Sequence, residues 1–206
     1  PPISPPDYQE KGEWATWSYY QETGNGYTGD WGAHHFDIAQ WALGLDGSAP
    51  VEYIPAGYDG TEYTTVKYAN GIVMTEQPFR EDDEHAKGIQ FIGTDGWIKV
   101  ARGYIECSDP SLLEKSEKEI EAGAYEVSAP HMQDFLDSMR TRLNPIAPVE
   151  AGCSTNILCC LINIATELKR PVKWNPVTLS FEGDKEAEAH RLYWYDYRQP
   201  YKLPYW

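Results

Sequence analysis

The residues "VEAGCSTNILCCLINIATELKR" (149–170) predict a long apolar helix, which ends at Pro171 because proline cannot continue a helix. A second helix is expected before it, at residues 128–142, where apolar side chains recur on one face. The chain has 206 residues, of which 41% are hydrophobic and 14% are aromatic. A chain of this composition can fill a core, so an intrinsically disordered protein is excluded.

Outside these helices, short β-like runs predict a sheet. Asn70-Gly71 separates two of the runs and Asp95-Gly96 interrupts another, and both dipeptides are typical of hairpin turns. Further helices are expected at residues 30–45 and 183–192. Antiparallel strands with helices to one side indicate an α+β fold, in which an open, mainly antiparallel β-sheet has helices packed on one face. The β-like runs are residues 13–20, 51–58, 62–69, 71–79 and 88–103.

The proline-rich residues 1–12 are typical of an extended linker. We interpret residues 13–206 as a single domain, because the length suits one large domain and no internal repeat is visible. The chain begins at Pro1 without a methionine. We therefore expect it to be a fragment or a processed product of a longer protein.

The net charge of −15 argues against nucleic acid and anionic membranes as partners, because both require clustered basic residues. No apolar run approaches the length of a bilayer span, which predicts no transmembrane helix. The cysteines form no C-x-x-C pair, which excludes a zinc ribbon, and buried free thiols are favoured over disulfides. Both a cytoplasmic and a periplasmic location stay open. The cysteines are Cys107, Cys153, Cys159 and Cys160.

The glycines of "GNGYTG" (24–29) spell G-x-G-x-x-G, the form of a dinucleotide-binding turn. Three observations count against that interpretation. Residues 13–20 mix polar and aromatic side chains, whereas the first strand of a dinucleotide fold is a continuous aliphatic run. Asp30 places a carboxylate where a pyrophosphate needs positive potential. The alternating βαβ units that such a fold requires do not follow.

Asp30 and His34 are four residues apart and therefore share one face of the expected helix, with Asp37 on the neighbouring edge. A carboxylate beside an imidazole fixes its tautomer and raises its basicity, as a general acid or base requires. Two alternatives stay open. His34 could pack in the core, or Asp30, His34 and His35 could bind a metal ion. His35 is expected to point about a quarter turn away from His34.

The segment "TGDWGAHHFDIAQWALG" (28–44) resembles the D-x-G-x-H segment of the glucose–fructose oxidoreductase, inositol 2-dehydrogenase and rhizopine-catabolism oxidoreductase (Gfo/Idh/MocA) family. The likeness is greatest to a branch from Bacteroidetes-type bacteria. It covers nearly the whole chain, and several motifs follow in the family's order. They are "IQFIGTDGWIKVARG" (89–103), "HMQDFLDSMRTRLNPIAPVEAG" (131–152), "LINIATELKRPVKWNP" (161–176), "FEGDKEAEAHRL" (181–192) and "YRQPYKLPYW" (197–206).

The resemblance implies a NAD(P)-dependent oxidoreductase that moves a hydride between its cofactor and a hydroxyl-bearing carbon of a sugar, polyol or glycoside. In that family an N-terminal dinucleotide-binding domain holds NAD or NADP and carries a catalytic lysine in a Glu-Lys-Pro segment. Neither that segment nor a credible nucleotide turn is found here. The chain therefore resembles only the substrate-side, C-terminal domain, which alone is expected to be inactive.

Carried over by position, His34 is the expected acid/base on the substrate hydroxyl and Asp30 is its partner, while Asp37 positions His34 or its helix. His35, Trp17 and Tyr19 are expected to contact the sugar, although ordinary packing is the alternative for the two aromatic residues. The resemblance also implies a homo-oligomer formed through the open face of the sheet. A non-redox sugar-binding or assembly module, and a metal-dependent lyase or hydrolase, stay open as alternatives.

Overall fold

The computed structural model describes residues 24–79, 87–121, 130–194, 197 and 199–201. The chain divides into two compact units, one of residues 1–77 with 153–206 and one of residues 78–152. Each unit is described by itself. The single domain expected over residues 13–206 stays a prediction, and the expected linker at residues 1–12 and strand at residues 13–20 lie outside the described residues.

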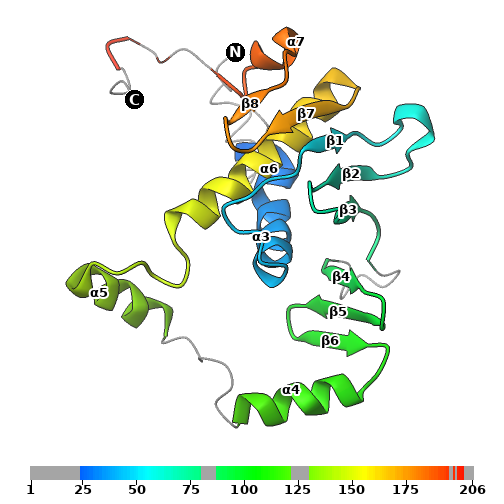
Figure 1. Ribbon diagram of the computed structural model, residues 1–206. Coiled ribbons are helices and arrows are strands. Elements are labelled where there is room, and N and C mark those ends of the chain that lie inside the picture. The colour runs from blue at the N-terminus through cyan, green and yellow to red at the C-terminus, as the bar shows by residue number, and fades with distance from the viewer. Residues whose placement is uncertain (1–23, 80–86, 122–129, 195–196, 198, 202–206) are drawn as a thin grey trace, which may run out of the picture. The chain divides into compact units, whose positions relative to one another are not determined.

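The first unit contains a five-stranded antiparallel sheet in the order β3-β2-β1-β7-β8, which is open at both edges (Figure 1). The Asn70-Gly71 hairpin is confirmed, because Lys67 pairs with Val73 across it and Gly71 adopts the positive φ of 90° that favours glycine. The strands are β1 (Glu52–Ile54), β2 (Thr64–Lys67), β3 (Val73–Glu76), β7 (Val172–Asn175) and β8 (Ser180–Phe181).

Helix α6 (Val149–Leu168) passes through the core of the first unit. Leu158 and Ile164 of this helix are completely buried, in one cluster with Tyr53 and Val66 of the sheet. The α6 helix is long and apolar enough to cross a membrane by length and composition alone, so the expectation that no run reaches that length is wrong. Half of its most apolar window is buried in the protein, as in the core helix of a folded domain.

Two further helical segments of the first unit precede its sheet in the chain. A π-helical turn, η2 (Thr28–Gly32), runs directly into helix α3 (Ala33–Ala42). A 3-10 turn, η3 (Tyr58–Gly60), follows β1, and a short helix, α7 (Lys185–Glu188), follows β8. The helix expected at residues 30–45 is therefore present, but it begins earlier and is π-helical at its start.

The second unit contains a three-stranded antiparallel sheet, β4-β5-β6 (Figure 1). The Asp95-Gly96 turn joins β4 (Ile89–Ile92) to β5 (Trp97–Ala101) as expected, and β6 (Tyr104–Cys107) is a strand that the sequence did not indicate. Helices α4 (Ser111–Glu121) and α5 (His131–Thr141) complete the unit. Mixed helices with open antiparallel sheets confirm the α+β class.

All four cysteines are free thiols, as expected, but burial varies among them. Cys159 is buried on α6, and this burial raises the pKa of its thiol to about 12, so it is an unreactive core residue. Cys153 is exposed, contrary to the expectation of buried thiols.

An ion-pair cluster fastens the end of α6 to α7. The guanidinium of Arg170 donates to both carboxylate oxygens of Asp184, at 2.6 and 2.9 Å, and to Glu186 at 2.7 Å. The Asp184 carboxylate also caps α7 by accepting from the backbone N–H of Ala187 at 3.1 Å. The hydrogen bonds from Arg170 hold the pKa of Asp184 below its ordinary value of 3.8.

The burial of Leu158 predicts a large cost for its truncation. We expect Leu158→Ala to lower the free energy of unfolding by about 2–5 kcal/mol, because a fully buried leucine leaves a cavity in the core. Leu179→Ala is the matched control, since that side chain is 52% exposed. Urea titration of both variants checks the difference, and equal losses would contradict the assignment of α6 as the core helix.

The lowered pKa of Asp184 predicts an acid-dependent loss of stability. Because the folded state holds this carboxyl ionised more strongly than the unfolded state, the contribution is complete above the ordinary value of 3.8 and is lost as pH falls through the lowered pKa. Because the pair is partly exposed to solvent, with 33% of the Arg170 and 22% of the Asp184 side chain accessible, the contribution is limited to on the order of 1 kcal/mol. Between pH 5 and about pH 2, the free energy of unfolding should therefore fall less in Asp184→Asn than in Asp46→Asn, the control at an exposed position. Unfolding curves recorded across this pH range measure the difference.

Candidate functional site

The candidate site lies on the continuous helix formed by η2 and α3. Asp30 lies inside the π turn, in its first turn of backbone. A π turn closes hydrogen bonds between residues five apart and therefore contains one residue more than an α turn. Such turns are rare and are found frequently at functional sites. The point on the helix surface that lies one full turn after Asp30 is consequently between His34 and His35.

The glycine segment before the π turn is folded back on itself. The N–H of Gly29 donates to the carbonyl oxygen of Asn25 at 3.2 Å, and Gly26 is buried. A Cβ atom at Gly29 would lie 2.6 Å from the Cβ of Asn25 and 2.8 Å from the carbonyl oxygen of Gly24. A pyrophosphate needs bare amide groups and room to approach them. In this segment the Gly29 N–H is already bonded and the space beside Gly29 is filled by Asn25 and Gly24, which argues against a dinucleotide here.

His34 is exposed in the first turn of α3, so the alternative of a core histidine is wrong. Its ring lies 5.8 Å from the indole of Trp31, centroid to centroid. The ring of His35 stacks on the same indole at 6.3 Å. Both imidazoles therefore lie beside Trp31, although they are adjacent in the chain.

The tautomer of His35 follows from its contact with the backbone. Its Nδ1 atom lies 3.0 Å from the carbonyl oxygen of Trp31, and because a carbonyl only accepts, Nδ1 must carry the proton. In the neutral ring Nε2 is then the acceptor atom. This bond also satisfies a carbonyl within the π turn, where the regular α-helical pattern of backbone bonds is interrupted.

Asp37 faces α6. Its carboxylate accepts from the hydroxyl of Thr155 at 3.1 Å, and that hydroxyl accepts from the side-chain amide of Gln40 at 3.2 Å. Gln40 is completely buried and its Oε1 accepts from the hydroxyl of Tyr68 at 3.1 Å. A buried polar group that lacks partners is costly, so this network fixes α3 against both α6 and the sheet. Of its two expected roles, Asp37 has contacts that suit positioning the helix.

The site can exchange protons, since an exposed imidazole follows a helical turn that carries a carboxylate. Among the described residues, no three His, Cys, Asp or Glu side chains are grouped closely enough to hold a metal ion. The alternative that Asp30, His34 and His35 bind a metal therefore has no geometric support.

A comparison with protein-family models identifies the chain. Residues 2–203 match the model described as "Oxidoreductase family, C-terminal alpha/beta domain" (GFO_IDH_MocA_C2). The chain belongs to the Gfo/Idh/MocA oxidoreductase family. Comparisons with curated proteins and with solved structures gave no match. Members of this family are generally NAD(P)-dependent oxidoreductases, and the chain corresponds to their C-terminal domain.

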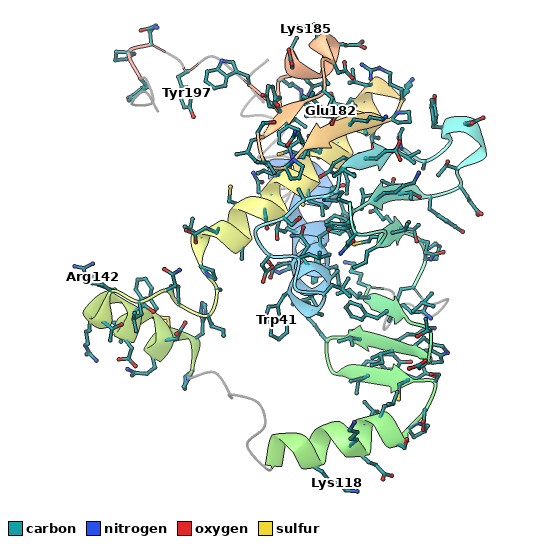
Figure 2. The ribbon with its side chains drawn as sticks, viewed as in Figure 1. Trp41, Lys118, Arg142, Glu182, Lys185 and Tyr197 are labelled. Carbon is teal, nitrogen blue, oxygen red and sulfur yellow. The ribbon has the colours of Figure 1, made fainter. Side chains whose placement is uncertain are left out.

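In this Gfo/Idh/MocA domain the structure describes four of the six residues expected from the sequence. Asp30, His34, His35 and Asp37 lie within three consecutive helical turns of η2 and α3. Trp17 and Tyr19 lie outside the described residues. Figure 2 shows α3 with Trp41 projecting from its C-terminal end.

Sequence reasoning missed the polar side chains that hold this helix in place. They are Asn25, Gln40, Tyr68, Thr155 and Asn163. A signal for one was present, because Asn163 interrupts the apolar run of α6 and a buried amide requires partners.

The crowding at Gly29 predicts that any side chain there displaces the glycine segment. We expect Gly29→Ala to lower the free energy of unfolding by about 1–3 kcal/mol through overpacking. Gly152→Ala on α6 is the matched control, because open space surrounds its Cβ position and alanine favours a helix by up to about 1 kcal/mol. Thermal unfolding of both variants checks this, and a Gly29→Ala protein as stable as the control would contradict the packing described.

Proposed function

We propose that this chain is the substrate-side domain of a NAD(P)-dependent oxidoreductase that acts on a hydroxyl group of a sugar, polyol or glycoside. The observation that carries the proposal is the exposed imidazole of His34, which follows the π turn bearing Asp30 in a chain of this family. An exposed, helix-mounted imidazole suits proton exchange with a substrate, whereas a buried one would suit packing.

His34 has a defined task in such a reaction. When a hydroxyl is oxidised to a carbonyl, its oxygen loses a proton while its carbon loses a hydride. The nicotinamide cofactor supplies the hydride chemistry when it is bound. His34 accepts the hydroxyl proton in the oxidative direction and returns it in the reductive direction, which requires a neutral ring before oxidation.

The neighbouring residues have supporting roles in this proposal. Asp30, on the π turn directly before α3, is the proposed partner of His34. His35, with its proton held on Nδ1 by the carbonyl of Trp31, presents Nε2 as an acceptor for a substrate hydroxyl. Asp37 positions α3 through Thr155. Trp17 and Tyr19 are proposed to stack on the apolar faces of the sugar ring.

The cofactor, NAD or NADP, is proposed to bind a separate dinucleotide-binding domain of the full-length protein. This assignment rests on the folded-back glycine segment, which does not fit a pyrophosphate. The chain alone should therefore be inactive. A homo-oligomer formed through the open sheet face is proposed with it. The net charge of −15 is consistent with a neutral small-molecule substrate rather than nucleic acid or an anionic membrane.

The decisive experiment removes the proposed acid/base in the full-length product of the gene. We expect His34→Ala to lower kcat with the physiological sugar by about 10²–10⁴-fold, the usual contribution of general acid–base catalysis. Cofactor oxidation or reduction is followed by absorbance. Asp30→Asn should give a smaller loss, because it leaves the imidazole in place.

His131→Ala is the matched control, since His131 is exposed on the second unit, and it should keep the rate of the unaltered protein. A His34→Ala protein that turns over at the unaltered rate would refute the acid/base assignment. Sugar binding without any change in NADH or NADPH would instead favour the non-redox sugar-binding module.

A further inference from the structure

We infer that Asn25 and Asn163 form a positioning pair that keeps the start of the catalytic helix in its π-helical form and so fixes the position of Asp30 relative to His34. The inference deepens the proposed function and rests on it, because the pair matters for turnover only if His34 acts as the acid/base. Neither asparagine is proposed to touch substrate.

The pair is held by a concentrated set of hydrogen bonds. The side-chain amide of Asn163 donates to the carbonyl oxygen of Asn25 at 2.9 Å and to its side-chain oxygen at 2.6 Å. The side-chain amide of Asn25 donates in turn to the sulfur of Cys160 at 3.3 Å. Cys160 and Asn163 are one turn apart on α6, so two neighbouring side chains of this helix form hydrogen bonds with Asn25.

Both asparagines occupy positions that are unfavourable unless other interactions compensate. Asn163 is 4% exposed within an apolar helix, where an amide without partners would be destabilising. Asn25 has a φ of 63°, in the left-handed region that is unfavourable for non-glycine residues and in which asparagine is enriched. Each residue compensates for the unfavourable setting of the other, which is the behaviour expected of a matched pair.

Asn25 is in turn hydrogen-bonded to the π turn itself. The carbonyl oxygen of Asn25 accepts both the Asn163 amide and the N–H of Gly29, the second residue of η2. The absent Cβ of Gly29 is what allows Asn25 to approach so closely. Any movement of Asn25 therefore moves the π turn that carries Asp30.

The π turn needs this support because an α turn is the more stable alternative. A π turn contains one extra residue, and each residue of a helix accounts for a rotation of about 100°. If the turn relaxed to the α form, Asp30 would rotate about the helix axis relative to His34, away from the position that it has in the structure. The Thr155–Asp37 bond holds only the part of α3 that follows His34, so it cannot prevent the rotation. The asparagine pair fixes the other end.

The test compares three substitutions in the full-length product of the gene. Asn163→Ala removes the donor, and Asn25→Gly removes the receiving side chain while keeping a residue that tolerates a positive φ. Asn156→Ala is the matched control, because Asn156 is exposed on the same helix. The Asn25→Gly protein keeps the test decisive if Asn163→Ala fails to fold.

Nuclear magnetic resonance provides the readout that does not depend on catalysis. We expect Asn163→Ala and Asn25→Gly to speed hydrogen exchange at residues 28–32 by about tenfold or more, the result of removing at least 1.4 kcal/mol of local stability. The ring resonances of His34 and Trp31, which lie 5.8 Å apart, should shift in both variants. Exchange and ring resonances like those of Asn156→Ala in both variants would overturn the inference.

Kinetics separate positioning from substrate binding. Both variants should lower kcat by about 10- to 100-fold, as expected for a catalytic group displaced by about 1 Å, and change KM by less than about twofold. The double variant should lose no more than either single variant, because the two residues act as a unit. A rise in KM at an unchanged kcat would overturn the positioning role. Altered ring resonances at an unchanged kcat would uphold the pair and refute the catalytic role of His34 instead.

Discussion

Burial of α6 is the constraint on which the rest of the first unit depends. The helix places Leu158 and Ile164 in the apolar cluster with the sheet, and the same burial encloses Thr155 and Asn163. Buried polar groups must be hydrogen-bonded, and on an α-helix the backbone is already satisfied internally. The partners therefore have to come from another element. The partners lie on α3 and on the segment just before η2, so one requirement both builds the core and orients the candidate site.

The two attachments have different consequences. The network of Asp37, Thr155, Gln40 and Tyr68 joins three elements and is fully enclosed at Gln40, so it fixes the direction of α3 in space. The contacts of Asn163 with Asn25 act on the segment before the helix and govern how its first turn is wound. The direction of α3 and the winding of its first turn together decide where the His34 imidazole and the Asp30 carboxylate point. Neither of these two side chains is part of the core.

Much of the fold could be predicted because local signals agree with the final structure. Asn70-Gly71 and Asp95-Gly96 mark hairpins by backbone chemistry alone, and the strands on either side pair as expected. The α5 and α6 helices follow from apolar spacing. Strand β6 gave no such signal, because its short run of Tyr104–Cys107 mixes polar and apolar residues and is stabilised by pairing with β5.

The sequence by itself determined the family, the α+β class and the candidate residues Asp30, His34, His35 and Asp37, because motif order and residue spacing are properties of the chain. Only the tertiary structure decided that His34 is exposed, that Asp37 faces Thr155 and that Asn25 packs against Gly29 too closely for a side chain there. It also decided that the helix begins with a π turn. Spacing rules assume a regular helix. The contact that displaces this helix from regularity comes from Asn163, 138 positions away in the chain.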